Sequence, residues 1–245
     1  MFPLRAIIGL CVKLRIHPNT LTLIGVLINV GAAWAFGYGR FMIAFVALLV
    51  ANIFDFIDGK VAHQLKLQSA FGAFWDSTLD RFSDFALITG LIYLYSKHHR
   101  TDYVLIASLA LIFSIMTSYA RARAESLVQK CKVGFMERPE RIVLFMIGAV
   151  TNRMAAVLWV VLVLSILTVA NRIYYTFLAL NGLPMPTKEG AAGLFNRAFF
   201  WTDERATLPY DMWVIAILAF VWLTPPDWLG DPMASGQGLL GLLFN

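Results

Sequence analysis

Six apolar stretches, separated by short polar segments, constrain the fold of this chain more than any other feature. They lie at approximately residues 21–38, 41–58, 71–95, 102–120, 140–151 and 154–178. A bilayer core about 30 Å thick is crossed by about 20 mostly apolar helical residues. The fifth stretch is short, and the second and third contain carboxylates. We therefore expect an all-α, polytopic membrane protein with six transmembrane helices.

Charged residues are too scarce to cover a soluble globule of this size. They make up 14% of the 245 residues, and 59% are hydrophobic, whereas soluble domains carry about 25% charged residues. This composition excludes a soluble enzyme, a disordered chain and a disulfide-stapled secreted module. Cys11 and Cys131 lie far apart and lack the spacing of a metal or redox pair. The net charge of +5 indicates basic residues beside membrane lipids, with no nucleic-acid partner.

The N-terminal segment, residues 1–16, predicts an interfacial amphipathic helix. Leu4, Ile7, Ile8 and Cys11 fall on one face, with basic residues near the other. A break and an N-cap follow at residues 17–20, before the first span.

The remaining sequence divides into two parts. Residues 17–180 form the six-helix domain, and residues 181–245 form a C-terminal extension of unknown role. The extension is rich in Gly and Pro and contains one apolar run, residues 212–223. Twelve residues are short for a span, so we expect an extra short helix that is interfacial or re-entrant.

Basic residues predict the orientation in the membrane, because cytoplasmic loops carry an excess of Lys and Arg. With the N-terminus inside, eleven basic residues lie on the cytoplasmic side and four on the other. The eleven are Arg5, Lys13, Arg15, Lys60, Lys66, Arg121, Arg123, Lys130, Lys132, Arg138 and Arg141; the four are Arg40, Lys97, Arg100 and Arg153. We expect a multi-pass protein of a bacterial or archaeal cytoplasmic membrane, with its N-terminus and active site facing the cytoplasm.

Four carboxylates occur within two neighbouring spans. Asp55 and Asp58 close the second span, and Asp76 and Asp80 lie in the third. Residues three or four apart project from one face of a helix, so each span offers a carboxylate pair. Ionisable residues inside membrane spans are costly and mark function by default. Carboxylates converging from two helices would suit a hard divalent cation such as Mg²⁺.

Structural ion pairing is the competing interpretation of these acids. Lys60, Lys66 and Arg81 are the nearby bases, and with Asp84 there are five acids. Three bases cannot neutralise five acids in a low-dielectric site. Gly59 and Gly72 remove side chains where a ligand would approach the backbone, although small residues also serve close helix packing.

The carboxylate pattern resembles the signature of the CDP-alcohol phosphotransferase family. Residues 55–63 read DFIDGKVAH, eight residues follow, and residues 72–80 read GAFWDSTLD. The family pattern is D-x-x-D-G-x-x-A-R-x8-G-x3-D-x3-D. The resemblance covers about residues 17–178, including the entry to the first span, His17–Thr22, and does not cover the extension.

The resemblance implies roles for individual residues. Asp55, Asp58, Asp76 and Asp80 would hold two divalent ions, Mg²⁺ or Mn²⁺, and Asp80 would act as the catalytic general base. The nucleotide of a CDP-linked lipid would be bound at five positions, which are Asp55, Gly59, Ala62, His63 and Gly72. The family has Arg where this sequence has His63. Because His is not a fixed bidentate cation, a catalytically weak family member is an alternative.

A second cluster of charged residues gathers at the cytoplasmic end of the fourth span and the start of the fifth. Within the family, the run SYARARAE at 118–125 and the run ERPER at 137–141 resemble the branch that makes phosphatidylinositol phosphate or its archaeal counterpart. That resemblance implies an acceptor phosphate bound by Ser118, Arg121, Arg141 and Arg172. Positive-inside topology and snorkelling are the alternative explanation for such arginines.

The resemblance implies transfer of a phosphatidyl group from CDP-diacylglycerol to a phosphorylated polyol such as inositol 1-phosphate, with release of CMP. Glycerol 3-phosphate or another alcohol is an alternative acceptor. An ion-coupled transporter using the aspartates as ligands is an alternative of another class, although no inverted repeat is visible. A homodimer is expected from the resemblance alone.

Overall fold

The computed structural model describes residues 2–184, 193, 196–197, 201 and 208–234. Within these residues, the regular elements are helices and there is no strand, so the all-α prediction is confirmed. The chain divides into two compact units, Met1–Arg100 and Thr101–Asn245.

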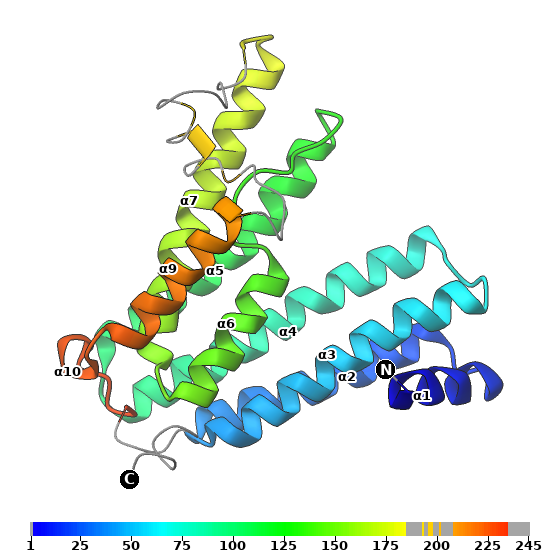
Figure 1. Ribbon diagram of the computed structural model, residues 1–245, viewed down its shortest axis with the longest axis horizontal. Helices are drawn as coiled ribbons and strands as arrows, with labels where there is room; N and C mark the ends of the chain where they lie inside the picture. The colour runs from blue at the N-terminus through cyan, green and yellow to red at the C-terminus, as the bar shows by residue number, and fades with distance from the viewer. Residues whose placement is uncertain (1, 185–192, 194–195, 198–200, 202–207, 235–245) are drawn as a thin grey trace. The chain divides into compact units, whose positions relative to one another are not determined.

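The first unit consists of four helices. They are α1 (Phe2–Lys13), α2 (Pro18–Gly37), α3 (Phe41–Gln64) and α4 (Ala70–Lys97). Helix α2 packs on both α3 and α4, and the three long helices lie side by side (Figure 1). These three apolar helices therefore form one bundle. The aspartates and glycines of the family signature, on α3 and α4, lie at the same end of it.

Two of these helices, α2 and α4, begin with a side-chain cap. The ring of His17 accepts a hydrogen bond from the backbone N–H of Asn19 at 3.2 Å, and Pro18 occupies the first turn of α2. The break and N-cap predicted there are confirmed. Ser69 caps α4 by accepting a hydrogen bond from the N–H of Gly72 at 3.0 Å. Such caps satisfy backbone donors that lack a partner in the first helical turn.

Helix α1 packs against α3 with only part of its predicted apolar face. Ile8 and Cys11 are buried in a cluster with Ile57 and Val61 of α3, and Leu4 packs against this cluster. Ile7, which we assigned to the same face, is 46% exposed. The buried stripe is therefore narrower than the sequence predicted.

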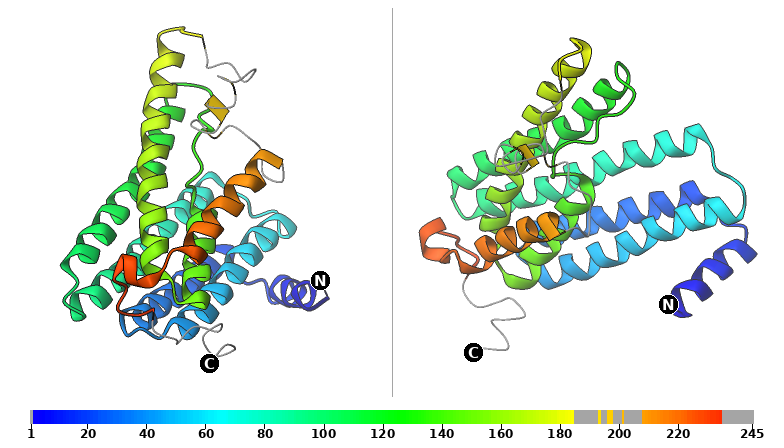
Figure 2. Two further views of the ribbon diagram at one scale, coloured as in Figure 1. Left: turned by 60° about the vertical axis from the view of Figure 1, so that its left-hand side comes forward. Right: turned by 45° about the horizontal axis from the view of Figure 1, so that its top comes forward.

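Among the described residues of the second unit, three helices belong to the main domain, and α9 and α10 belong to the extension. They are α5 (Thr101–Glu125), α6 (Arg138–Thr151), α7 (Met154–Leu180), α9 (Leu208–Leu223) and α10 (Pro226–Leu229). Within this unit, α5 and α7 run in the same direction and pack closely. Helix α6, which follows α5 and precedes α7 in the chain, runs in the opposite direction (Figures 1 and 2).

The apolar run at residues 212–223, expected to form a short interfacial or re-entrant helix, lies within α9. This helix has 16 residues and packs along α7 in the opposite direction (Figure 2), so it lies along a candidate membrane-spanning helix. An interfacial helix needs a polar face, and α9 has a single charged residue, Asp211, while Ile215 and Leu223 are exposed. A helix that is apolar on all sides belongs in a core or a bilayer.

Among the described residues, four helices are long and apolar enough to cross a membrane, namely α2, α3, α5 and α7. Helix α4 is 28 residues long but contains Asp76, Asp80, Arg81 and Asp84, and α6 has only 14 residues. Four apolar spans together with these shorter or more polar helices agree with the prediction of a polytopic membrane protein.

The close packing of α2 on α4 gives a stability prediction. A Cβ added at Gly90 would lie 2.2 Å from the carbonyl oxygen of Ala33, so Gly90→Ala must push the helices apart. We expect a loss of about 1–3 kcal/mol, the usual cost of overpacking, seen as a lower Tm in detergent. Gly31→Ala is the control, because a Cβ there meets no atom within 4 Å. Equal Tm values for the two variants would contradict this account.

Candidate active site

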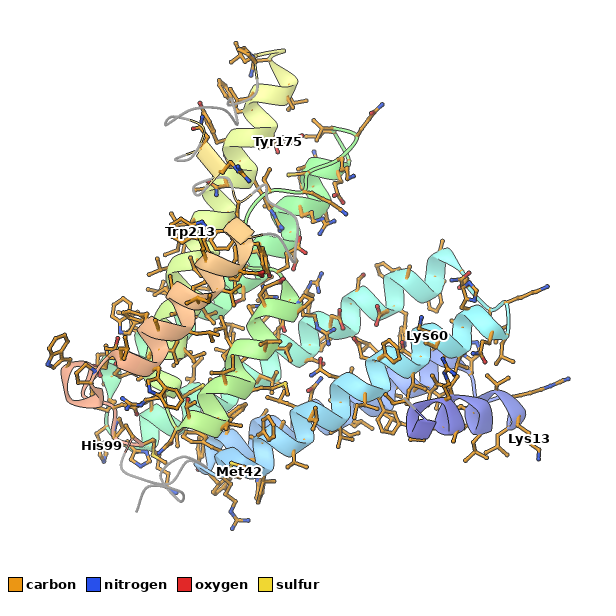
Figure 3. All side chains as sticks on the ribbon, in the orientation of Figure 1. Lys13, Met42, Lys60, His99, Tyr175 and Trp213 are labelled. Atoms are coloured by element: carbon orange, nitrogen blue, oxygen red, sulfur yellow. The ribbon has the colours of Figure 1, made fainter. Side chains whose placement is uncertain are left out.

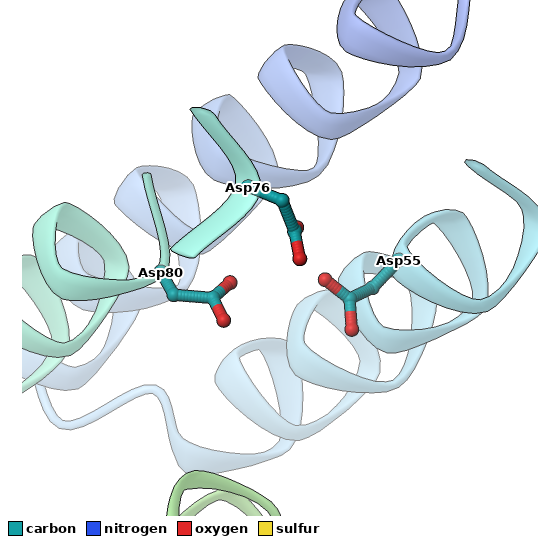
Figure 4. Close-up of side chains that lie close together, drawn as sticks. All are labelled: Asp55, Asp76 and Asp80. Carbon is teal, nitrogen blue, oxygen red and sulfur yellow. The ribbon is translucent and has the colours of Figure 1, made fainter. Parts of the chain in front are cut away.

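Three carboxylates from two helices converge in the first unit. Asp55 lies on α3, and Asp76 and Asp80 lie one turn apart on α4 (Figure 4). One carboxylate oxygen from each residue lies within 4.8 Å of those of the other two, and all three residues are half-buried. The spacing of four residues puts Asp76 and Asp80 on one face of α4, which is why both can meet Asp55.

The donor set of this group fits a hard divalent cation. Carboxylate oxygens are the ligands that Mg²⁺ and Mn²⁺ prefer, and three like charges this close repel each other strongly unless a cation offsets them. Arg81 lies beside this group, with its Nη1 3.9 Å from Oδ2 of Asp80.

Asp58 lies outside this three-carboxylate group but next to it in the fold. It is buried on α3, and the hydroxyl of Thr22 on α2 donates a hydrogen bond to its Oδ2 at 2.6 Å. We did not assign a role to Thr22 from the sequence. Thr22 is the last residue of the family-like segment His17–Thr22, and this segment could have identified it as a site residue.

A cavity of about 280 Å³ adjoins the carboxylates in the first unit. Gly59, Ala62 and Gly72 line it together with Asp58 and Asp76. A Cβ added at Gly59 would meet no atom within 4 Å, whereas one at Gly72 would lie 3.2 Å from Oγ of Ser69. The structure thus brings three of the five residues predicted to bind nucleotide around one cavity.

The other two residues predicted to bind the nucleotide are not in the cavity wall. His63 is exposed near the end of α3, and Asp55 points toward Asp76 and Asp80 instead. His63, which stands where the family pattern has Arg, is therefore exposed and outside the cavity wall.

An arginine cluster forms a second site in the Thr101–Asn245 unit. Arg141 and Arg172 are almost fully buried, at 0% and 2% exposure, and Arg121 is partly exposed. Arg141 donates a hydrogen bond to the hydroxyl of Thr117 at 3.3 Å. Arg172 donates to the carbonyl oxygen of Val133 at 3.0 Å and to that of Thr117. Three of the four residues predicted to bind the acceptor phosphate therefore belong to one network.

Glu137 links two of these arginines. Its Oε1 accepts hydrogen bonds from Arg121 Nη1 at 2.8 Å and from Arg172 Nη2 at 3.1 Å. Arg121 also bonds to Glu125 at 3.0 Å through Nε. An arginine has five N–H donors. Two bonds leave three donors on Arg121, and three bonds leave two on Arg172. The cluster is thus oriented by Glu137 and still has donors for an anion.

Two residues of this network were not predicted. Glu137 appeared in the sequence only as the first letter of the ERPER run, and Thr117 only as the neighbour of Ser118. Ser118 itself is half-buried, and the hydrogen bonds of the cluster run through Thr117 instead. The sequence contained no signal for these pairings, because they join residues 16 to 55 positions apart.

Comparison with known proteins decides the family. The family described as CDP-alcohol phosphatidyltransferase matches residues 15–170. The chain belongs to this family. The match includes the whole carboxylate signature, the cavity glycines and the arginines at positions 121 and 141. The chain is therefore a metal-dependent transferase of phospholipid biosynthesis, as the resemblance predicted, and the transporter alternative is disfavoured.

Relatives within the family include inositol phosphate lipid synthases. An archaetidylinositol phosphate synthase of Pyrococcus horikoshii is 35% identical over 173 residues, covering 70% of this chain and 89% of that one. A phosphatidylinositol phosphate synthase of Mycobacterium tuberculosis is 31% identical, covering 66% and 80%. An uncharacterized protein of Aquifex aeolicus is 38% identical over 170 residues, covering 69% and 86%.

Solved structures of the Mycobacterium tuberculosis phosphatidylinositol phosphate synthase PgsA1 share the fold. The structure with CDP-DAG bound has a TM-score of 0.67 at 27% identity and covers 72% of this chain and 94% of that one. The structure in complex with manganese and citrate has a TM-score of 0.66 at 27% identity, covering 70% and 88%.

Cys131 gives a test of how the loop near Glu137 packs. The thiol is fully buried, and burial raises its pKa above the ordinary value. Because the thiolate is the reactive form, we expect slow maleimide labelling at pH 8 that keeps increasing at higher pH. The measurement uses a Cys11→Ala variant, so that Cys131 is the remaining thiol. As a control, Ser126→Cys in a chain without Cys131 should label fast, because Ser126 is exposed; equal rates would contradict the burial.

Proposed function

We propose that this enzyme transfers the phosphatidyl group of CDP-diacylglycerol to the hydroxyl of a phosphorylated polyol, inositol 1-phosphate being the first choice. A bond forms between the acceptor oxygen and the lipid-side phosphorus, and the bond from that phosphorus to CMP breaks. The proposal rests on the three-carboxylate group of Asp55, Asp76 and Asp80. The similarity of this chain to inositol phosphate lipid synthases supports it.

Asp55, Asp58, Asp76 and Asp80 would hold two divalent ions, Mg²⁺ or Mn²⁺. The solved structure of PgsA1 in complex with manganese and citrate supports such a site. When bound, the ions neutralise the pyrophosphate charge and stabilise the leaving phosphate. Asp80 takes the proton from the attacking hydroxyl as the general base. Thr22 keeps the Asp58 carboxylate in place.

The cavity lined by Gly59, Ala62 and Gly72 would take the cytidine nucleotide. The absence of side chains at the two glycines lets the ligand approach the backbone. His63 can donate one hydrogen bond to the nucleotide, but not the bidentate pair of an arginine. The relative with CDP-DAG bound supports a CDP-lipid donor.

The arginine cluster would bind the phosphate of the acceptor. Arginine binds phosphate through two parallel N–H donors, and Arg121 and Arg172 retain such donors after pairing with Glu137. Arg141 and Ser118 would complete the site. Three guanidinium groups in one place suit a phosphorylated acceptor better than a neutral alcohol.

In the membrane, we propose six spans, with α4 and α6 added to the four apolar ones. The distribution of Lys and Arg supports a cytoplasmic N-terminus and active site in a bacterial or archaeal membrane. A homodimer is proposed from family membership alone.

An acceptor screen tests the function. The purified protein is given CDP-diacylglycerol with Mg²⁺ or Mn²⁺ and, in separate reactions, inositol phosphate, glycerol phosphate, serine or choline, and CMP release is measured. We expect turnover with inositol phosphate. Turnover only with glycerol phosphate or an unphosphorylated alcohol would reassign the acceptor. No turnover with any acceptor in a folded preparation would refute the proposed reaction.

Removing one carboxylate of the three-residue group should abolish turnover. In Asp76→Asn the charge and one anionic ligand are lost, so we expect kcat to fall by at least about 100-fold, in line with groups that act directly in metal-assisted catalysis. Mn²⁺ binding, followed by electron paramagnetic resonance, should weaken as well. Asp211→Asn, an exposed acid on α9, is the control and should leave both unchanged.

Arg121→Lys should weaken acceptor binding without affecting the donor. Lysine keeps the charge but lacks the planar fork, so we expect the KM for the acceptor to rise about tenfold, within the range for hydrogen bonds to charged groups. The KM for CDP-diacylglycerol should stay constant. Arg123→Lys, two residues further on the same helix and exposed, is the matched control. An equal rise in both KM values would argue against a phosphate contact.

A further inference from the structure

The C-terminal extension touches the loop that carries Glu137, within the Thr101–Asn245 unit. This loop, residues 131–137, is the second part of the connection from α5 to α6 and lies against α7. The backbone N–H of Met136 donates to the hydroxyl of Thr168 at 3.1 Å, and Arg172 donates to Val133. At Gly134, with φ of +89°, an added Cβ would lie 2.5 Å from Thr168. The loop is therefore pressed closely onto α7.

Phe135 of this loop is covered by aromatic residues of the extension. Its ring centroid lies 4.1 Å from that of Trp201 and 5.7 Å from that of Tyr210. Trp201 in turn lies 5.6 Å from Trp213, which Figure 3 shows near the start of α9. We call Trp201, Tyr210 and Trp213 the aromatic clamp. Tyr210 also donates a hydrogen bond to Glu140 at 3.4 Å, so the clamp contacts the loop and the first turn of α6.

The other end of α9 is fastened by hydrogen bonds. Arg153 donates to the carbonyl oxygen of Thr224 at 3.0 Å, and Tyr103 donates to that of Leu229 at 2.7 Å. The backbone N–H of Ala155 donates to Asp231 at 3.2 Å. These bonds hold the segment after α9 against the beginnings of α5 and α7.

Between these two attachments, α9 packs loosely. One apolar cavity of about 620 Å³ lies along it with Val163 and Ile217 in its wall, and a second of about 350 Å³ is lined by Val143 and Leu218. The contact with Phe135 is the attachment through which the extension meets the loop that carries Glu137.

Phe135 lies two residues before Glu137, which orients Arg121 and Arg172. We infer that the aromatic clamp fixes the loop through Phe135, holds Glu137 between the two guanidinium groups, and thereby sets the affinity for the acceptor phosphate. Phe135 and Trp201 are positioning residues and touch no substrate. This inference deepens the proposed function and rests on it. It gives a role to an extension that lies outside the family match, which ends at residue 170.

The test removes the ring of Trp201. In Trp201→Ala we expect the KM for the phosphorylated acceptor to rise about two- to tenfold, the change that corresponds to the energy of an aromatic pair, while kcat and the KM for CDP-diacylglycerol stay constant. Trp222→Ala is the matched control, because Trp222 lies on α9 and is 52% exposed. Trp201→Phe retains a ring and should restore most of the affinity.

Hydrogen exchange gives a readout that does not need turnover. The amides of residues 131–137 should exchange faster in Trp201→Ala than in the wild type, while those of α5 stay protected. An equal change in both KM values, no change in either, or faster exchange throughout the unit would overturn the inference. If the alanine variant does not fold, Trp201→Leu is measured in the same way. An inactive wild type would refute the proposed reaction, and the exchange data would still decide whether the clamp holds the loop.

Discussion

Charge inside a low-dielectric bundle has to be offset, and the rest of this structure depends on how that is done. In the first unit, carboxylate oxygens of Asp55, Asp76 and Asp80 lie within 4.8 Å of one another, with Arg81 beside Asp80, and Asp58 is held by Thr22. Carboxylates this close repel each other, so their geometry suits a bound divalent cation. The caps at His17 and Ser69 start α2 and α4 where this arrangement requires. The close approach of Gly90 to Ala33 joins the same two helices.

In the second unit, the buried charges are positive and belong to the arginine cluster. Buried guanidinium groups need acceptors, and the backbone carbonyls of Val133 and Thr117 supply some of them to Arg172, with Glu137 supplying the charge. A loop that provides acceptors must itself stay in place. Its contacts with Thr168 on one side and with Trp201 on the other provide that support. A site for an anion thus depends on packing at residues that carry no charge.

Much of the fold was predictable, because helical spans in a bilayer are defined by local apolar length and by caps. The six stretches and the N-terminal helix correspond to α1–α7 within a few residues. The placement of α9 was not predictable from its length, since twelve to sixteen apolar residues suit an interface or a partial span equally well. At the site, the spacing of Asp76 and Asp80 predicted a shared face, and the glycines predicted an open cavity. The contacts of Thr22, Thr117 and Glu137 were not predicted, because their partners lie far away in the sequence.

The sequence by itself determined the membrane class, the helical elements and the family chemistry, because those follow from composition and from residues at short, regular spacing. Only the tertiary structure decided which acids meet, since Asp55 joins Asp76 and Asp80 while Asp58 turns to Thr22. It also decided that Glu137 links two arginines and that an extension without a recognisable motif covers Phe135. These are contacts between side chains of distant segments, and their existence depends on how helices pack, which no local pattern encodes.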